Sequence, residues 1–238
     1  MATDEHTIKE HDRELESLRG RMLQMGGLVE SQLRMAIDCF ERADLHKADE
    51  VVEADERVDA DEIELARLIM NLIVRRRPAA NDLRLIMAVS HAVTDLERIG
   101  DEATKIARAA RWVSQKDVAV RTPRLRDIRV SAEVALSMLH SALDAFARLD
   151  AVAAAGVIRE DEDVDEQFRL ILRQLITFMM EDPRTITGSL DTVWVAKAIE
   201  RIGDHSKNIA SDVIFIVQGE DVRHATPEQI ARAVSQAT

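Results

Sequence analysis

The chain has 238 residues, 46% of them hydrophobic and 32% charged, and its formal net charge is −12. This excess of acids disfavours nonspecific binding to nucleic acid or to anionic lipid, and suits a cation or a partner with a basic surface. Aromatic residues are 3% of the chain and tyrosine is absent. The core must therefore consist of aliphatic residues and Met, which predicts an all-α fold and argues against a sandwich or barrel.

The single cysteine and the N-terminal residues indicate the cellular compartment of the protein. Cys39 is the only cysteine, which excludes an internal disulfide, and it is most simply a small buried hydrophobe. The first residues include neither a basic region nor an apolar run, so no signal peptide is predicted. No stretch approaches the ~18 apolar residues that a membrane span needs. We therefore expect a cytoplasmic protein.

Apolar residues recur at helical spacing along the first half and predict three long helices. From Leu15 to Val29 they step by three and four positions in turn, which is typical of a packed helix. The basic run Arg75–Arg77 and the following Pro78 indicate a helix end. We expect helices over Thr7–Ala43, His46–Arg75 and Asp82–Val113.

A polar stretch, Ser114–Asp117, separates the two halves of the chain. We assign residues 1–117 to a first three-helix repeat and residues 118–238 to a second repeat with a C-terminal tail. Gly219 predicts a helix stop. We expect helices over Pro123–Arg148, Val152–Met180 and Arg184–Val217, and a short helix from Thr226-Pro227.

The pentapeptide Glu-Arg-Ile-Gly-Asp occurs at Glu97–Asp101 and again 103 positions later, at Glu200–Asp204. Two further blocks recur in the same order upstream. Asp55–Asp59 matches Asp161–Asp165, and Met35–Asp44 matches Ser141–Asp150. This period is too long for a solenoid repeat. It predicts a duplicated unit: two tandem three-helix bundles of six long helices, related by a pseudo-twofold repeat.

Each half carries two acidic pairs at i, i+4 spacing, one near the start of its second helix and one midway along its third. Nineteen residues separate Asp59 from Pro78, and nineteen separate Pro78 from Glu97. On antiparallel neighbouring helices the two pairs then lie at nearly the same height. Four carboxylates can converge in each half: Asp55, Asp59, Glu97 and Asp101 in the first, and Asp161, Asp165, Glu200 and Asp204 in the second.

Four carboxylates held together cost stability unless a cation or a base neutralises them. Oxygen ligands favour Mg, Mn, Fe or Ca, so a metal site is one hypothesis, to which His205 could add a ligand. The other is that Arg98, Arg201 and nearby basic groups form structural ion pairs. Gly100 and Gly203 indicate close approach of a neighbouring helix, with the acids on an accessible flank.

Motifs for catalysis are not visible in the sequence. There is no nucleophilic triad, no Gly-rich phosphate loop and no His-Glu-x-x-His zinc motif. A di-iron carboxylate bundle needs Glu-x-x-His on paired helices, and the repeated motif does not supply it. The prediction is therefore a protein that is not an enzyme.

At the repeated motif the chain resembles the PhoU family, accessory regulators of bacterial phosphate uptake. Asp95–Ala103 and Ala196–Ala210 resemble the two signature segments of that family, and Val217–His224 resembles the segment after the second. The resemblance implies two three-helix bundles and Glu/Asp-x-x-x-Asp motifs that bind metal clusters, with iron or zinc in some relatives. By position the implied ligands are the same eight carboxylates.

The resemblance also implies a function. It is that of a negative regulator without catalytic activity, linking a phosphate ABC transporter to a sensor histidine kinase. The expected partners are the transporter ATPase and the kinase. We expect a homodimer that reaches the membrane only through these partners. The expected cofactors are divalent or iron-type ions: Fe, Zn, Mn or Mg. Lys105 stands where the family usually has Asn, as at Asn208, and Glu102 is a second departure, which makes the first metal site the less secure.

Two other functions stay open on sequence grounds. One is a metal-dependent enzyme or a metal-storage protein built on a helical carboxylate bundle. The other is a purely structural coiled-coil protein, which would bind no metal.

Overall fold

The computed structural model describes residues 2–42, 44–115 and 125–235, and within them the secondary structure is helical throughout, without a strand. All six predicted long helices and the short last one are confirmed. The expected helix start at Pro123 and the boundary between residues 117 and 118 lie outside the described residues. The helices are α1 (Ala2–Arg42), α2 (Leu45–Arg76), α3 (Ala80–Gln115), α4 (Leu125–Arg148), α5 (Ala151–Glu181), α6 (Ile186–Gln218) and α7 (Pro227–Ser235), with a 3-10 turn at Pro183–Thr185 before α6.

The second helix of each repeat begins at a capping aspartate. The carboxylate of Asp44 accepts hydrogen bonds from the backbone N–H groups of residues 46 and 47 at the start of α2. Asp150 accepts from those of residues 152 and 153 at the start of α5. Such caps satisfy donors that the first helical turn leaves unpaired. The two aspartates hold the same position in the repeated blocks, so the duplication extends to the caps.

Residues of positive φ follow three of the described helices: Arg77 after α2, Leu149 after α4, with φ of 52°, and Gly219 after α6. Arg77, with φ of 48°, closes α2, and Gly219, with φ of 76°, closes α6 by donating its N–H to the carbonyl of Phe215. Both helix ends lie where the sequence predicts them. Positive φ carries no Cβ penalty in glycine, which explains the residue at position 219.

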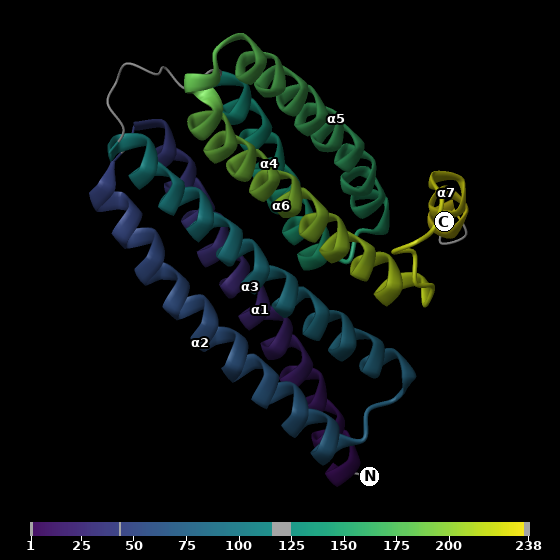
Figure 1. Cartoon of the computed structure of the whole chain (residues 1–238). Helices are drawn as coiled ribbons and strands as arrows, with labels where there is room; N and C mark the ends of the chain where they lie inside the picture. Colours follow the sequence, from purple (N-terminus) through teal and green to yellow (C-terminus); the bar gives the residue numbers. More distant parts are fainter. Residues whose placement is uncertain (1, 43, 116–124, 236–238) are drawn as a thin grey trace.

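Two three-helix bundles, α1–α3 and α4–α6, lie side by side with α3 against α6 (Figure 1). Helix α1 also packs on α4, where a Cβ on Gly26 would stand 2.6 Å from a methyl carbon of Leu143. The buried residues of both bundles form one apolar cluster. The predicted stripe from Leu15 to Val29 belongs to it, and so does Cys39, whose thiol donates to the carbonyl of Asp44.

None of the described helices is long and apolar enough to cross a lipid bilayer.

Candidate functional site

Close approach of the second and third helices brings the predicted carboxylates together in each half. A Cβ on Gly100 would lie 3.1 Å from Asp55 Oδ1 and 3.1 Å from Gln32 Oε1. A Cβ on Gly203 would lie 3.4 Å from Val164 Cγ1. Both glycines are buried against the preceding helix. The predicted role of these glycines in helix contact is confirmed.

The first-half carboxylates face one another across α2 and α3. Burial, and then repulsion from Asp55 and Asp101, raise the pKa of Asp59 above its ordinary value. Burial, and then repulsion from Asp101 and other acids that include Asp59, raise the pKa of Glu97. Gln32 Nε2 donates to Asp55 Oδ1 at 2.9 Å from α1. The four carboxylates therefore share one electrostatic environment, as the heights along the helices predict.

Little positive charge offsets this first cluster. Among the described residues its one ion pair joins Lys105 Nζ to Asp101 at 3.9 Å, and Lys105 also donates to Glu102 at the shorter distance of 3.0 Å. Asp101 is exposed and Glu97 is half-buried, so the cluster lies on an accessible flank, as expected. Its surplus of negative charge attracts a cation.

The second cluster differs because basic side chains hold three of its four carboxylates. Lys207 Nζ lies 2.6 Å from Asp161 Oδ2, and Arg169 lies 3.1 Å from Asp165. Lys197 pairs with Glu200. Burial, and then repulsion from Glu200 and Asp161, raise the pKa of Asp204. This half therefore shows the ion-pair alternative, formed by lysines and Arg169.

Comparison of the repeats explains the difference. Lys207 stands where the first repeat has Thr104, and Gln32 stands where the second has Met138. Asp55 therefore receives a neutral donor from α1, whereas Asp161 receives a cation from α6. The departures at Glu102 and Lys105 predict that the second metal site is the more secure, whereas the ion pairs of the second cluster favour the opposite order. The Thr-to-Lys difference in the aligned repeats is the signal that could have revealed it.

The carboxylate oxygens of the two clusters can be compared with what a metal ion requires of its ligands. Within residues 2–42, 44–115 and 125–235, no group of three or more His, Cys, Asp or Glu side chains is arranged to hold a metal ion. The all-oxygen donor set of the first cluster fits a hard cation. Burial first, and then repulsion between the acids, raise the pKa values of Asp59 and Glu97, and a bound cation would oppose both effects. In the second cluster a metal would have to displace Lys197 and Lys207. Metal binding by the eight carboxylates stays a prediction.

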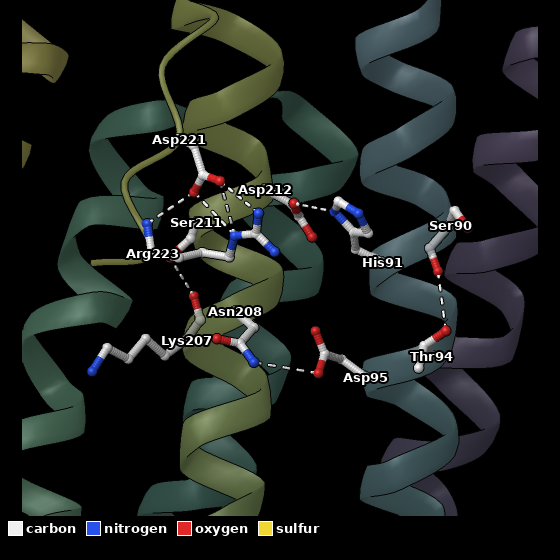
Figure 2. Close-up of polar contacts among 10 residues, drawn as sticks. All are labelled: Ser90, His91, Thr94, Asp95, Lys207, Asn208, Ser211, Asp212, Asp221 and Arg223. Atoms are coloured by element: carbon white, nitrogen blue, oxygen red, sulfur yellow. Dashed lines mark hydrogen bonds and ion pairs between the residues drawn. The ribbon is translucent and has the colours of Figure 1, made fainter. Parts of the chain in front are cut away.

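A second polar site, which the sequence does not predict, lies between α3 and α6 (Figure 2). Asp95 and Asp212 are only 6% and 3% exposed. His91 Nδ1 lies 3.2 Å from Asp212 Oδ1, and Asn208 Nδ2 donates to Asp95 Oδ1 at 3.3 Å. Burial raises the pKa of Asp212 to about 7, although His91 opposes the shift. Hydrogen-bonded pairs around two buried aspartates thus join the two bundles.

His205 and the motif arginines also belong to this interface. His205 Nδ1 lies 2.8 Å from Asp95 Oδ1, so it contacts α3 and is not placed as a ligand of the carboxylate cluster, which corrects the expectation for it. Arg201 donates to Glu102 at 3.1 Å, and Arg98 lies 4.0 Å from Asp95. Although the charge of Arg98 acts to lower the pKa of Glu97, neither arginine forms an ion pair with a motif carboxylate in the described part of the chain. Their direction, about 100° around the helix from the neighbouring acid, explains why.

The polar interface lines an open pocket of about 270 Å³. It is lined by His91, Thr94, Asp95, Asn208, Asp212 and Arg223, among others. Arg223 follows α6 and is held by Asp221 (Figure 2). The pocket is formed where α3 of the first repeat packs against α6 of the second.

Comparison with known proteins gives the chain its relatives. The family model described as "PhoU domain" matches residues 22–110 and 128–213, once in each half. A curated protein from Burkholderia sp, named "Phosphate-specific transport system accessory protein PhoU homolog", is 44% identical over 96% of this chain and 97% of its own length. The protein of that name, without "homolog", from Escherichia coli (strain K12) is 38% identical over 98% of this chain and 95% of its own length.

Solved structures agree with these matches. The crystal structure of PhoU from Pseudomonas aeruginosa superposes with a TM-score of 0.84 at 42% identity, covering 88% of this chain and 99% of its own. A phosphate transport system regulatory protein PhoU from Streptococcus pneumoniae reaches a TM-score of 0.82 at 24% identity, covering 89% of this chain and 99% of its own, which supports the fold alone.

Proposed function

The chain belongs to the PhoU family, and we propose that it is a regulatory protein of phosphate uptake that acts without catalytic turnover. Its relatives carry the name of accessory proteins of the phosphate-specific transport system. The observation that supports the proposal most directly is the doubled Glu-Arg-Ile-Gly-Asp motif, each copy packed on an Asp-x-x-x-Asp helix through its glycine.

In the finer form of the proposal, the protein is a cytoplasmic adaptor and negative regulator. It links a phosphate ABC transporter, through its ATPase subunit, to a sensor histidine kinase, and it acts as a homodimer that reaches the membrane only through these partners. A long helical surface without catalytic motifs suits such a role. The net charge of −12 supports protein partners with basic surfaces over nucleic acid.

Deletion of the gene tests the regulatory role. With ample phosphate, the deletion strain should express its phosphate-starvation genes constitutively, and the intact gene should restore repression. A pull-down from phosphate-replete cells should recover the transporter ATPase and the kinase. An unchanged starvation response after deletion would contradict the proposal.

We further propose that the eight carboxylates bind divalent or iron-type ions (Fe, Zn, Mn or Mg), the first cluster more tightly than the second. The physical reason is that Lys197 and Lys207 compete for the second cluster. Elemental analysis after loading and dialysis tests this. The pair Glu97→Gln and Asp101→Asn should remove more metal than the matched pair Glu200→Gln and Asp204→Asn. Equal losses, or no bound metal in the wild type, would refute the order.

A further inference from the structure

The pseudo-twofold repeat creates two grooves between α3 and α6, and their linings have diverged. The first is the polar pocket that contains His91, Asp95 and Asp212. At the matching positions the repeat places Trp194, Ala198 and Ala109, and these line a second groove of about 400 Å³. At equivalent positions of the two repeats, the first groove therefore has contacts between aspartates and histidines, and the second groove has an apolar surface.

An exposed tryptophan marks the second groove. Trp194 is 69% exposed, although large aromatic side chains are usually well buried. Beside it, Ala109, Val195 and Ala198 form an apolar wall across both helices. An indole ring open to solvent next to an apolar wall offers a flat surface on which a second ring can stack.

Basic side chains surround this apolar surface in a chain that is acidic as a whole. Lys105, Arg108, Lys197 and Arg201 line the groove against two acids, Glu102 and Asp191. Lys105 and Arg201 share Glu102, whose side chain is 6% exposed, and Lys197 pairs with Glu200 outside the groove. Arg108 is exposed and has no ion-pair partner in the described part of the chain. The groove therefore carries surplus positive charge.

We propose that this groove binds a nucleoside phosphate, with the base stacked on Trp194 and the phosphoryl oxygens contacting Arg108 and the neighbouring lysines. Its volume is within the range of small-molecule sites, which combine apolar walls with a few charged groups. Guanidinium groups pair with phosphate in a bidentate geometry. The inference goes beyond the proposed regulatory role, because it gives the protein a small-molecule input of its own.

The arrangement favours a nucleoside phosphate over the two other occupants of such a surface. A second copy of the chain would bring carboxylates to the cations. It would not combine an aromatic ring with a phosphate, which is what Trp194 and Arg108 together would select. An acidic peptide would satisfy the cations and leave the indole face without a specific contact. The experiments below separate both from a nucleoside phosphate. Dissociation of a dimer would indicate the second copy, and equal binding of ATP and inorganic phosphate would indicate recognition of charge alone, as in the binding of an acidic peptide.

The probes are ATP, AMP, adenosine and inorganic phosphate, added to the full chain in EDTA so that metal at the carboxylate clusters cannot recruit phosphate. The sequence has two tryptophans, Trp112 and Trp194, so a Trp112→Phe background makes Trp194 the only indole reporter. ATP should quench its fluorescence saturably. Adenosine and inorganic phosphate alone should bind at least ~10-fold more weakly, because each supplies one half of the contacts.

Substitutions test both halves of the site, with calorimetry as the readout where Trp194 is removed. Trp194→Leu and Arg108→Gln should each weaken ATP binding ~10-fold, the cost of one stacking or one charge-assisted contact. Arg98→Gln is the control for Arg108→Gln, because Arg98 is an exposed arginine on the same helix, α3, at the polar pocket and not at the second groove. It should leave ATP binding unchanged.

Three results would overturn the inference: no binding of ATP at millimolar concentration, equal binding of ATP and inorganic phosphate, or equal effects of Arg108→Gln and Arg98→Gln. Light scattering adds a fourth, since dissociation of a wild-type dimer by Trp194→Ala would make the groove a subunit interface. None of these results bears on the deletion phenotype, so failure here and failure of the regulatory proposal remain distinguishable.

Discussion

Asp212 is the side chain whose protonation most affects folding at the α3–α6 interface. Burial raises its pKa to about 7, while the unfolded chain has an ordinary carboxyl. The folded state therefore holds a proton that the unfolded state releases between about pH 4 and 7, and stability from this group is lost as the pH rises through that window. Its size is at most about 4 kcal/mol for a shift of this order.

Asp212→Asn should remove most of this pH dependence. The free energy of unfolding of the variant should fall less between pH 5 and pH 8 than that of the wild type, because the neutral amide has no charge to bury. Urea unfolding at several pH values measures it. His91, Asp95 and Arg223 face the same carboxyl and are retained. Substitution of the exposed Asp163 by Asn is the control, and identical slopes for wild type and Asp212→Asn would contradict the argument.

The two motif glycines, Gly100 and Gly203, occupy equivalent positions and can be compared by substitution with alanine. Gly100→Ala would place a methyl group 3.1 Å from two polar oxygens, whereas Gly203→Ala would meet Val164 at 3.4 Å, an ordinary contact. Alanine gains about 1 kcal/mol of helix propensity over glycine. Gly203→Ala should therefore be neutral or stabilising, and Gly100→Ala should be destabilising by about 1–2 kcal/mol. Urea midpoints measure both, and a stabilised Gly100→Ala would refute the steric explanation.

Helix boundaries follow from local chemistry, which is why the sequence predicts them. Apolar spacing, Pro78 and Gly219 each act within one or two turns of chain. The convergence of the acidic pairs follows as well, because it needs only antiparallel neighbours of known rise. The partners of those acids do not follow. Whether Lys207 reaches Asp161 depends on how the two helices are rotated, which spacing does not determine.

The caps of α2 and α5 offer a prediction for whole elements. Asp44→Ala and Asp150→Ala should each lower the free energy of unfolding by about 1 kcal/mol, since each leaves two N–H groups without the side-chain acceptor. Asp150→Asn keeps an acceptor oxygen and should retain most of the stability. Urea unfolding measures all three variants, and equal losses for Asp150→Ala and Asp150→Asn would show that charge, not hydrogen bonding, stabilises the helix start.

At the scale of the whole molecule, the duplication predicts two bundles. It does not predict that they share one apolar core. Phe40, Ile106, Ile128 and Ile199, from α1, α3, α4 and α6, are all at most 3% exposed and line one shared junction. The polar pairs of Asp95 and Asp212 lie at the contact of α3 with α6. No pattern within one repeat encodes a contact between repeats, so this interface and its two unlike grooves had to come from the structure.

A fused core has a consequence for unfolding. Because one apolar cluster spans both bundles, the two repeats should unfold in urea as one cooperative unit, without an intermediate that keeps the second bundle. Ile106→Ala should lower the free energy of unfolding by about 2–4 kcal/mol through the lost apolar contact and the cavity left behind.

Hydrogen exchange of the slowest amides decides whether that loss is shared. Under conditions where global unfolding dominates exchange, Ile106→Ala should reduce protection in α5 and α6 as much as in α2 and α3, although Ile106 lies on α3. An Ile69→Ala variant, buried on α2 within the first bundle, is the matched control for a core cavity far from the junction. If Ile106→Ala lowered protection in the first bundle alone, the repeats would be separate folding units that merely touch. Separation of the bundles would also expose Asp212, remove the burial that raises its pKa, and return that pKa toward its ordinary value.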